Sequence, residues 1–204
     1  MITIIDYNTG NLGSIQNIIK KIGGDSIISS DKEVIAGAEK IILPGVGAFD
    51  TGIRNLQELN LIDVLNHKII LEKIPVLGIC LGMQLMSESS EEGTLPGLGW
   101  ISGRTRRFNF FNTREHKIPH MGWNYISLHK SSRLFSDMYE EPRFYFVHSY
   151  FLYASNQSDI LTSTNYEIEF TSSVEKENIL GVQFHPEKSH KFGMKLLKNF
   201  LDYY

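Results

Sequence analysis

The sequence contains a single cysteine, Cys80, among its 204 residues. It therefore cannot form an intramolecular disulfide or a multi-cysteine zinc site, and a reducing cytoplasm is the expected location. The chain also lacks an excess of charge of one sign, because its net charge is only −3 and acidic and basic residues are interleaved. This balance argues against a nucleic-acid-binding protein and against a polybasic membrane-binding surface.

Long hydrophobic runs are absent as well. The apolar segment 1–6 is too short for a signal peptide and has no basic flank, and no run reaches the length of a membrane span. The sequence contains no internal repeat, low-complexity tract, metal-ligand cluster or nucleotide-binding motif. Since 42% of the residues are hydrophobic, we expect one soluble domain over residues 1–204, without metal or cofactor.

The first half of the chain alternates short apolar runs with helical patterns. Strands are predicted at residues 2–5, 26–29, 40–43 and 76–79. A helix with Leu12, Ile15, Ile19 and Ile22 on one side follows the first strand, and residues 51–72 are predicted to form one or two more helices. This repetition predicts an α/β fold, a flavodoxin-like sheet with helices on both faces.

The second half is richer in β-branched and aromatic residues. Runs at 100–108, 143–150, 160–164, 166–171 and 179–184 predict strands, mostly antiparallel, added to make a mixed sheet. The polar segment 109–117 is predicted to be an exposed loop, and residues 192–201 show the apolar spacing of a C-terminal amphipathic helix. Functional residues in such sheets gather at the carboxyl ends of the strands, where Asn11, the 45–47 loop and Cys80 are expected to meet.

Cys80 follows directly after the predicted strand 76–79, with Gly78 and Gly82 two residues to either side and helix-forming residues at 81–87. A strand, a tight turn with a nucleophilic side chain and a helix make a nucleophile elbow, here with cysteine in place of serine. The N-terminus of the following helix favours a thiolate. Taken alone, however, a cysteine in this position is more often an inert core residue.

A second motif, Gly181-Val-Gln-Phe-His185-Pro-Glu187, places a histidine after another apolar strand. Proline keeps the preceding residue extended, so the side chains of His185 and Glu187 are expected to point the same way. Cys80, His185 and Glu187 would then form a triad of nucleophile, base and orienting carboxylate. The alternative is an ordinary polar turn at the end of a strand.

Together these motifs resemble those of the class-I, or triad-type, glutamine amidotransferases. Within that family the chain is similar to the HisH-type glutaminase subunits of imidazole glycerol phosphate synthase. The similar segments are Ile5-Asp-Tyr-Asn-Thr-Gly-Asn-Leu12, Leu43-Pro-Gly-Val-Gly-Ala-Phe49, Pro119-His-Met-Gly-Trp-Asn124, Phe146-Val-His-Ser-Tyr150 and Glu187-Lys-Ser189. The resemblance thus extends over nearly the whole chain.

The resemblance implies a thioester mechanism in which Cys80 attacks the side-chain amide of L-glutamine, releases ammonia and is regenerated by water. The oxyanion hole would consist of the backbone N–H groups of Leu81 and Val46. The glycines around Val46 leave that peptide free to flip, so that the hole can be incomplete until a partner or ligand sets it. The implied substrate contacts are Gly45, Gly47, Gln84, Glu92, Ser149 and Tyr150. Glu91 remains an alternative to Glu92, and His148 is read equally well as a core histidine.

The same resemblance implies a partner, a HisF-type (β/α)₈-barrel synthase subunit that receives the ammonia in a heterodimer of histidine biosynthesis. Asn11, Met121, Trp123 and Lys188 match positions at that interface and its gate, although Trp123 could instead be a core aromatic residue. Three alternatives stay open. The chain could be a paralogue serving surface-polysaccharide sugar synthesis, suggested by the run 185–193, a non-catalytic regulatory subunit, or a γ-glutamyl peptidase or deglycase-like hydrolase.

Overall fold

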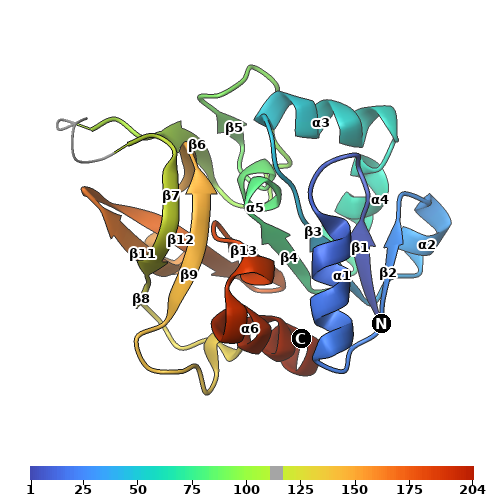
Figure 1. The fold of residues 1–204 in the computed structure, drawn as a ribbon. Coiled ribbons are helices and arrows are strands. Elements are labelled where there is room, and N and C mark those ends of the chain that lie inside the picture. The colour runs from blue at the N-terminus through green and yellow to red at the C-terminus, as the bar shows by residue number, and fades with distance from the viewer. Residues whose placement is uncertain (111–116) are drawn as a thin grey trace.

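The computed structural model describes residues 1–110 and 117–204, so most of the predicted loop at 109–117 lies outside the described residues. Its centre is an eight-stranded sheet with the order β2-β1-β3-β4-β13-β12-β11-β8 (Figure 1). The parallel part comprises β2 (Ser26–Ser29), β1 (Ile2–Ile5), β3 (Lys40–Leu43), β4 (Val76–Ile79) and β13 (Ile179–Val182). Antiparallel pairing then adds β12 (Ile168–Lys176), β11 (Ile160–Tyr166) and β8 (Ser127–Leu128). The predicted fold class is confirmed.

Helices cover both faces of this sheet because successive strand residues point in opposite directions. On one face, α1 (Leu12–Lys21) and α6 (His190–Tyr203) lie side by side and share a buried cluster with Ile4 (Figure 1). The neighbouring Ile5 belongs to the cluster on the other face. That face is covered by α2 (Lys32–Ala36), α3 (Phe49–Glu58), α4 (Ile62–Asn66) with its π-helical continuation η1 (His67–Leu71), and α5 (Leu81–Leu85).

Two smaller sheets complete the fold. One joins β10 (Tyr150–Ala154), β6 (Gly103–Arg107) and β5 (Ser89–Ser90), and the other pairs β7 (His120–Tyr125) with β9 (Arg143–His148). The prediction of one strand over 143–150 is wrong, because the chain leaves one sheet at His148 and enters the other at Tyr150. Short 3₁₀ helices occur at η2 (Arg133–Phe135), η3 (Gln157–Asp159) and η4 (Pro186–Lys188).

The sheet register brings the predicted functional segments together. Within the parallel part, Gly78 of β4 lies between Leu43 of β3 and Gly181 of β13. The loop 45–47, Cys80 and the segment 183–187 therefore all leave the sheet at the same edge, where ligands bind in open α/β sheets. None of the helices described in the structure is long and apolar enough to cross a lipid bilayer.

Candidate active site

Cys80 occupies a backbone conformation that is rare for a residue with a side chain, with φ 52° and ψ −106°. Such a conformation costs on the order of 1–3 kcal/mol and persists only where the surroundings impose it. Here the flanking glycines permit close packing of the turn. A Cβ atom at Gly82 would lie 1.7 Å from the carbonyl oxygen of Leu43, and one at Gly78 would lie 2.8 Å from the backbone nitrogen of Met83. The local geometry is that of the predicted nucleophile elbow.

His185 and Glu187 meet as the sequence predicts, but by a different backbone route. Pro186 begins the 3₁₀ helix η4, so the expected extended segment beyond His185 is wrong. His185 Nδ1 nevertheless lies 2.7 Å from Glu187 Oε1, and both side chains are almost completely buried. Ser189 stabilises this turn, because its hydroxyl donates a hydrogen bond to the carbonyl of His185 and accepts one from the N–H of Tyr145.

The pKa of His185 reflects its neighbours. Burial by itself lowers the pKa of an imidazole, but the side chains of Cys80 and Glu187 outweigh this effect as hydrogen-bond acceptors and negative charges. The net result raises the pKa of His185 to about 10. Among the described residues, His185 Nε2 has no hydrogen-bond partner of good geometry. The Cys80 sulfur therefore lies close enough to raise the pKa of the ring, but no well-aligned hydrogen bond joins the two. Loose geometry of this kind is common before substrate binds.

The predicted oxyanion donors are not both free. The N–H of Leu81 donates a hydrogen bond of 3.3 Å to the carbonyl oxygen of Gly45. Tyr7 holds the preceding residue, since its buried hydroxyl donates to the carbonyl of Pro44 and burial raises the pKa of this phenol. Gly47 has a φ of +113°, which glycine adopts readily. The Leu81 N–H is thus already bonded to the loop carbonyl of Gly45.

A cavity of about 440 Å³ opens beside Cys80. The predicted residues that line it are Val46, Gly47, Leu81, Gln84, Glu92, Ser149 and Tyr150. Of the predicted substrate contacts, Gly45 alone does not line the cavity. Three lining residues were given no role by the sequence: Pro119, Val147 and His148.

The structure distinguishes the two neighbouring glutamates at the cavity. Glu92 lines it and accepts a hydrogen bond of 2.9 Å from the N–H of Phe49. Glu91 instead turns to β6, where it accepts hydrogen bonds from the guanidinium of Arg104 and the N–H of Arg107. Glu92 is therefore the carboxylate available to a ligand in this cavity.

Three of the four predicted interface residues share one surface. Met121 and Trp123 on β7 are 61% and 43% exposed, so Trp123 is not a core residue. Trp123 contacts the ring of Tyr145, and the Lys188 ammonium lies 5.7 Å from the centre of the same ring. The fourth, Asn11, is at the start of α1, where its side chain accepts a hydrogen bond from the N–H of Ser14.

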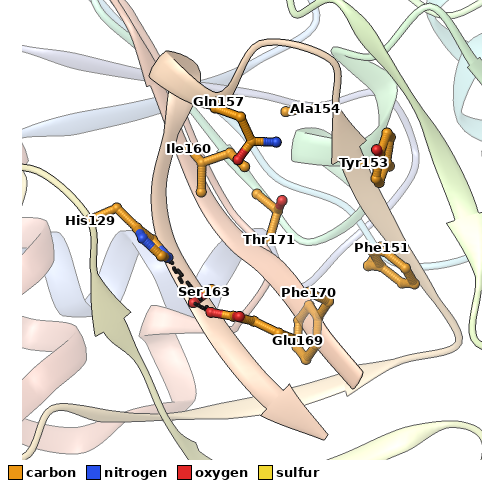
Figure 2. A pocket seen from close by; sticks show the side chains of 10 residues that line it. All are labelled: His129, Phe151, Tyr153, Ala154, Gln157, Ile160, Ser163, Glu169, Phe170 and Thr171. Carbon is orange, nitrogen blue, oxygen red and sulfur yellow. Dashed lines mark hydrogen bonds and ion pairs between the residues drawn. The ribbon is translucent and has the colours of Figure 1, made fainter. Parts of the chain in front are cut away.

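A second cavity, of about 210 Å³, lies between β10 and the strands β11 and β12 (Figure 2). His129 Nε2 lies 2.8 Å from the Ser163 hydroxyl, which donates a hydrogen bond to Glu169. In a hydrolytic triad the carboxylate holds the histidine, and the histidine takes the proton of the serine. Here the carboxylate holds the serine proton instead, so the cluster is a polar contact and not a second nucleophile.

The part of the chain that the structure describes contains no group of three or more His, Cys, Asp or Glu side chains arranged to hold a metal ion.

Comparison with known proteins identifies relatives over the whole chain. Residues 3–203 match the family model "Glutamine amidotransferase class-I". The chain is 58% identical over 201 residues to imidazole glycerol phosphate synthase subunit HisH 2 of Methanococcus maripaludis, covering 98% of both chains. It is 48% identical to subunit HisH 2 of Pseudomonas aeruginosa, covering 99% of both, and 47% identical to subunit HisH of Bdellovibrio bacteriovorus, covering 98% of both.

Solved structures share the fold at lower identity. A crystal structure described as a glutamine amidotransferase superimposes with a TM-score of 0.73 at 16% identity and covers 99% of this chain and 98% of that one. A structure of PurLQS from Thermotoga maritima gives a TM-score of 0.70 at 16% identity, covering 99% of this chain and 97% of that one.

Proposed function

The chain belongs to the class-I glutamine amidotransferase family, and on that premise we propose that it is the glutaminase subunit of an imidazole glycerol phosphate synthase. Three relatives with that name are 47–58% identical to it over nearly their full length. The observation that carries the proposal is that Cys80, which lines the cavity, lies close enough to the buried His185–Glu187 pair to raise the pKa of His185. The proposed enzyme hydrolyses a carboxamide, the side chain of glutamine, as a step of histidine biosynthesis.

In the proposed mechanism, Cys80 attacks the side-chain carbonyl carbon of glutamine as a thiolate and forms a tetrahedral oxyanion. His185, protonated near neutral pH because its pKa is raised to about 10, donates its proton to the amide nitrogen, and ammonia leaves. Water then attacks the γ-glutamyl thioester while His185 takes up the water proton, and glutamate is released with the thiolate restored. Glu187 orients the imidazole through Nδ1.

We assign the hydrogen bond between Leu81 and Gly45 to a resting state. While the Gly45 carbonyl accepts the N–H of Leu81, that donor cannot serve an oxyanion. Rotation of the peptide between Gly45 and Val46 would withdraw the carbonyl and turn the Val46 N–H toward the sulfur. Two donors would then be present, each worth roughly 10²–10³ in rate. Such a switch would hold back ammonia release until the synthase is engaged.

The proposed partner is a HisF-type (β/α)₈-barrel protein that receives the ammonia and makes imidazole glycerol phosphate and an aminoimidazole carboxamide ribotide. It would dock on the surface formed by Met121, Trp123 and Lys188, with Asn11 nearby, because α1 contacts the short helix η4 that bears Lys188. Exposed Trp and Met side chains are enriched at the centres of interfaces.

A second candidate keeps the chemistry and changes the pathway. Several relatives carry the numeral 2 in their names, among them those of Methanococcus maripaludis and Pseudomonas aeruginosa. A paralogue that supplies ammonia for surface-polysaccharide sugars would have the same triad and a different synthase.

The experiment that separates these candidates is rescue of a histidine auxotroph that lacks its own glutaminase subunit. The proposal predicts growth without histidine for the wild type and none for Cys80→Ala. A glutamine-mimicking diazo ketone that labels Cys80 shows in parallel that the protein is active. No rescue by a protein that is labelled in this way would contradict the histidine assignment and favour the paralogue.

A further inference from the structure

Two buried histidines connect β7 to the Cys80 cavity: His120 is the first residue of β7, and His148 ends β9 and lines the cavity. They are direct partners across the β7–β9 pair and are 2% and 5% exposed. Neither belongs to the triad or to the glutamine contacts proposed above. An aromatic cage encloses both rings: Phe108, Phe146, Tyr166 and Phe170.

The cage keeps both imidazoles neutral. Burial lowers the pKa of His120 to about 4. Burial first, and then the neighbouring rings of His120 and His185, lower the pKa of His148 to about 3. A neutral imidazole has one donor and one acceptor nitrogen. Each hydrogen bond of the pair therefore runs from a fixed donor nitrogen to a fixed acceptor.

That direction is fixed from both ends. The carbonyl of Tyr150 can only accept, so His148 Nδ1, 2.8 Å away, must donate to it. His148 Nε2 then accepts from His120 Nδ1 at 3.0 Å, and His120 Nε2 accepts from the Asn124 amide at 3.3 Å. The same amide nitrogen donates to the carbonyl of Asn165 at 2.9 Å, which independently identifies it as the donor. Protonation of either ring would break this order.

Beyond Tyr150 the hydrogen bonds continue to the nucleophile. The Tyr150 carbonyl also accepts the Gln84 amide at 2.8 Å, and the same nitrogen donates to Gln183 Oε1 at 3.1 Å. The amide of Gln183 in turn lies 3.7 Å from the sulfur of Cys80. The Gln84 amide nitrogen thus serves two acceptors, and Gln84 itself lines the cavity. An unbroken set of hydrogen bonds thus connects Cys80 to Asn124 on β7.

We propose that His120 and His148 are positioning residues for glutamine, which act as a one-way hydrogen-bond relay that holds the Tyr150 carbonyl and the Gln84 amide in the cavity wall. The proposal deepens the proposed function and rests on it. Tyr150 is where the chain passes from one small sheet to the other, so side chains have to fix its carbonyl. The relay also connects this wall to β7, whose exposed Met121 and Trp123 belong to the proposed docking surface.

Three variants separate positioning from packing. His148→Phe removes the donor to Tyr150 and leaves an aromatic ring in the cage. His148→Asn keeps a donor, since an asparagine amide nitrogen takes the place of Nδ1. Phe146→Leu loosens the cage, where Phe146 stacks on His120 with 4.8 Å between ring centres, and leaves the relay intact.

Glutaminase kinetics are measured with the synthase partner present, on variants whose circular dichroism and Tm show a folded chain. We expect His148→Phe to raise KM for glutamine about tenfold and to change kcat less than about threefold, the pattern of lost substrate binding. His148→Asn should recover most of that loss, and Phe146→Leu should keep the KM of the wild type. A KM within about twofold of the wild type for His148→Phe, or an equal rise for Phe146→Leu, would overturn the proposal.

A second readout is independent of activity. Nitrogen-15 NMR of the histidine rings in the free chain should show the Nδ1–H tautomer for both residues, without titration between about pH 5 and 8. An Nε2–H tautomer or a midpoint in that range would refute the relay. Absence of glutaminase activity in the wild type with any synthase would instead refute the proposed function, and the NMR result would still decide the direction of the relay.

Discussion

The proposed chemistry of this protein depends on side chains whose surroundings give them a conformation or a pKa that they would not have in water. Cys80 is held at a positive φ by the elbow, and His185 is buried between a sulfur and a carboxylate. Anionic neighbours raise the pKa of His185 despite its burial, whereas burial among aromatic rings lowers the pKa of His120 and His148. The identity of the neighbour thus decides whether an imidazole in this region is protonated near neutral pH, as the proposed mechanism needs, or stays neutral.

The neutral pair predicts acid sensitivity. Its pKa values, about 4 and about 3, lie below the value of 6.5 that an unperturbed histidine has. As pH falls the unfolded chain therefore binds protons first, so the stability that the pair contributes is complete above pH 6.5 and is lost progressively toward pH 3–4. The loss is on the order of a few kcal/mol for the pair as a whole, because one pKa unit corresponds to about 1.4 kcal/mol.

Urea unfolding of the wild type and of His148→Phe, measured at several pH values, checks this prediction. The free energy of unfolding should fall less steeply with decreasing pH in the variant, since one titrating group is gone while the carboxylates are unchanged. If the free energy of unfolding depended on pH in the same way in both proteins, His148 would not be held neutral.

At the scale of elements, the elbow is a close approach of three strands and a helix. α5 is only five residues long, and Gly82 packs against the backbone of β3. Because backbone cannot move aside as a side chain can, this contact fixes where Cys80 lies relative to the 45–47 loop.

Gly82→Ala is accordingly expected to be severe, with a loss of more than about 3 kcal/mol in the free energy of unfolding. The matched control is Gly13→Ala in α1, where an added Cβ would meet nothing within 4 Å. That substitution should stabilise the helix by up to about 1 kcal/mol. Denaturant unfolding of both variants tests these predictions. A Gly82→Ala protein as stable as the wild type would show that the turn can accommodate a Cβ atom.

The elements that could be predicted from the sequence are those whose signals are local. The four strands β1 to β4 have the predicted bounds because each is a short apolar run between turn residues. The sequence could propose Cys80 and His185 as triad residues because each follows such a run, β4 and β13. β7 was not predicted as a strand: Gly122, with a φ of 128°, interrupts it, and its apolar residues Met121 and Trp123 face outward.

Properties that depend on distant contacts could not be read in this way. The choice between Glu91 and Glu92 is made by Arg104, which pairs with the first. The connection of His148 to β7 arises only when β7 and β9 pair. In both cases the sequence shows a plausible side chain, and a partner from another element decides its role.

At the scale of the whole molecule, the nucleophile and the proposed docking surface lie on separate elements that meet through β7, β9 and η4. The exposed apolar residues Met121, Trp123 and Tyr125 all lie on β7. A synthase bound there would cover these three side chains. They alternate along β7 with His120, Gly122 and Asn124, which lie on the opposite face of the strand. This arrangement fits an enzyme that releases ammonia into a partner.

The central claim is that ammonia is made at Cys80 and used at a different site, and the most direct test compares two nitrogen sources. Cys80→Ala is purified with its synthase, and formation of imidazole glycerol phosphate is measured with glutamine and, separately, with an ammonium salt. The account predicts that glutamine-supported synthesis falls by at least about 10³-fold, while ammonium-supported synthesis stays within about twofold of the wild type. Loss of both activities together, or continued synthesis from glutamine, would contradict it.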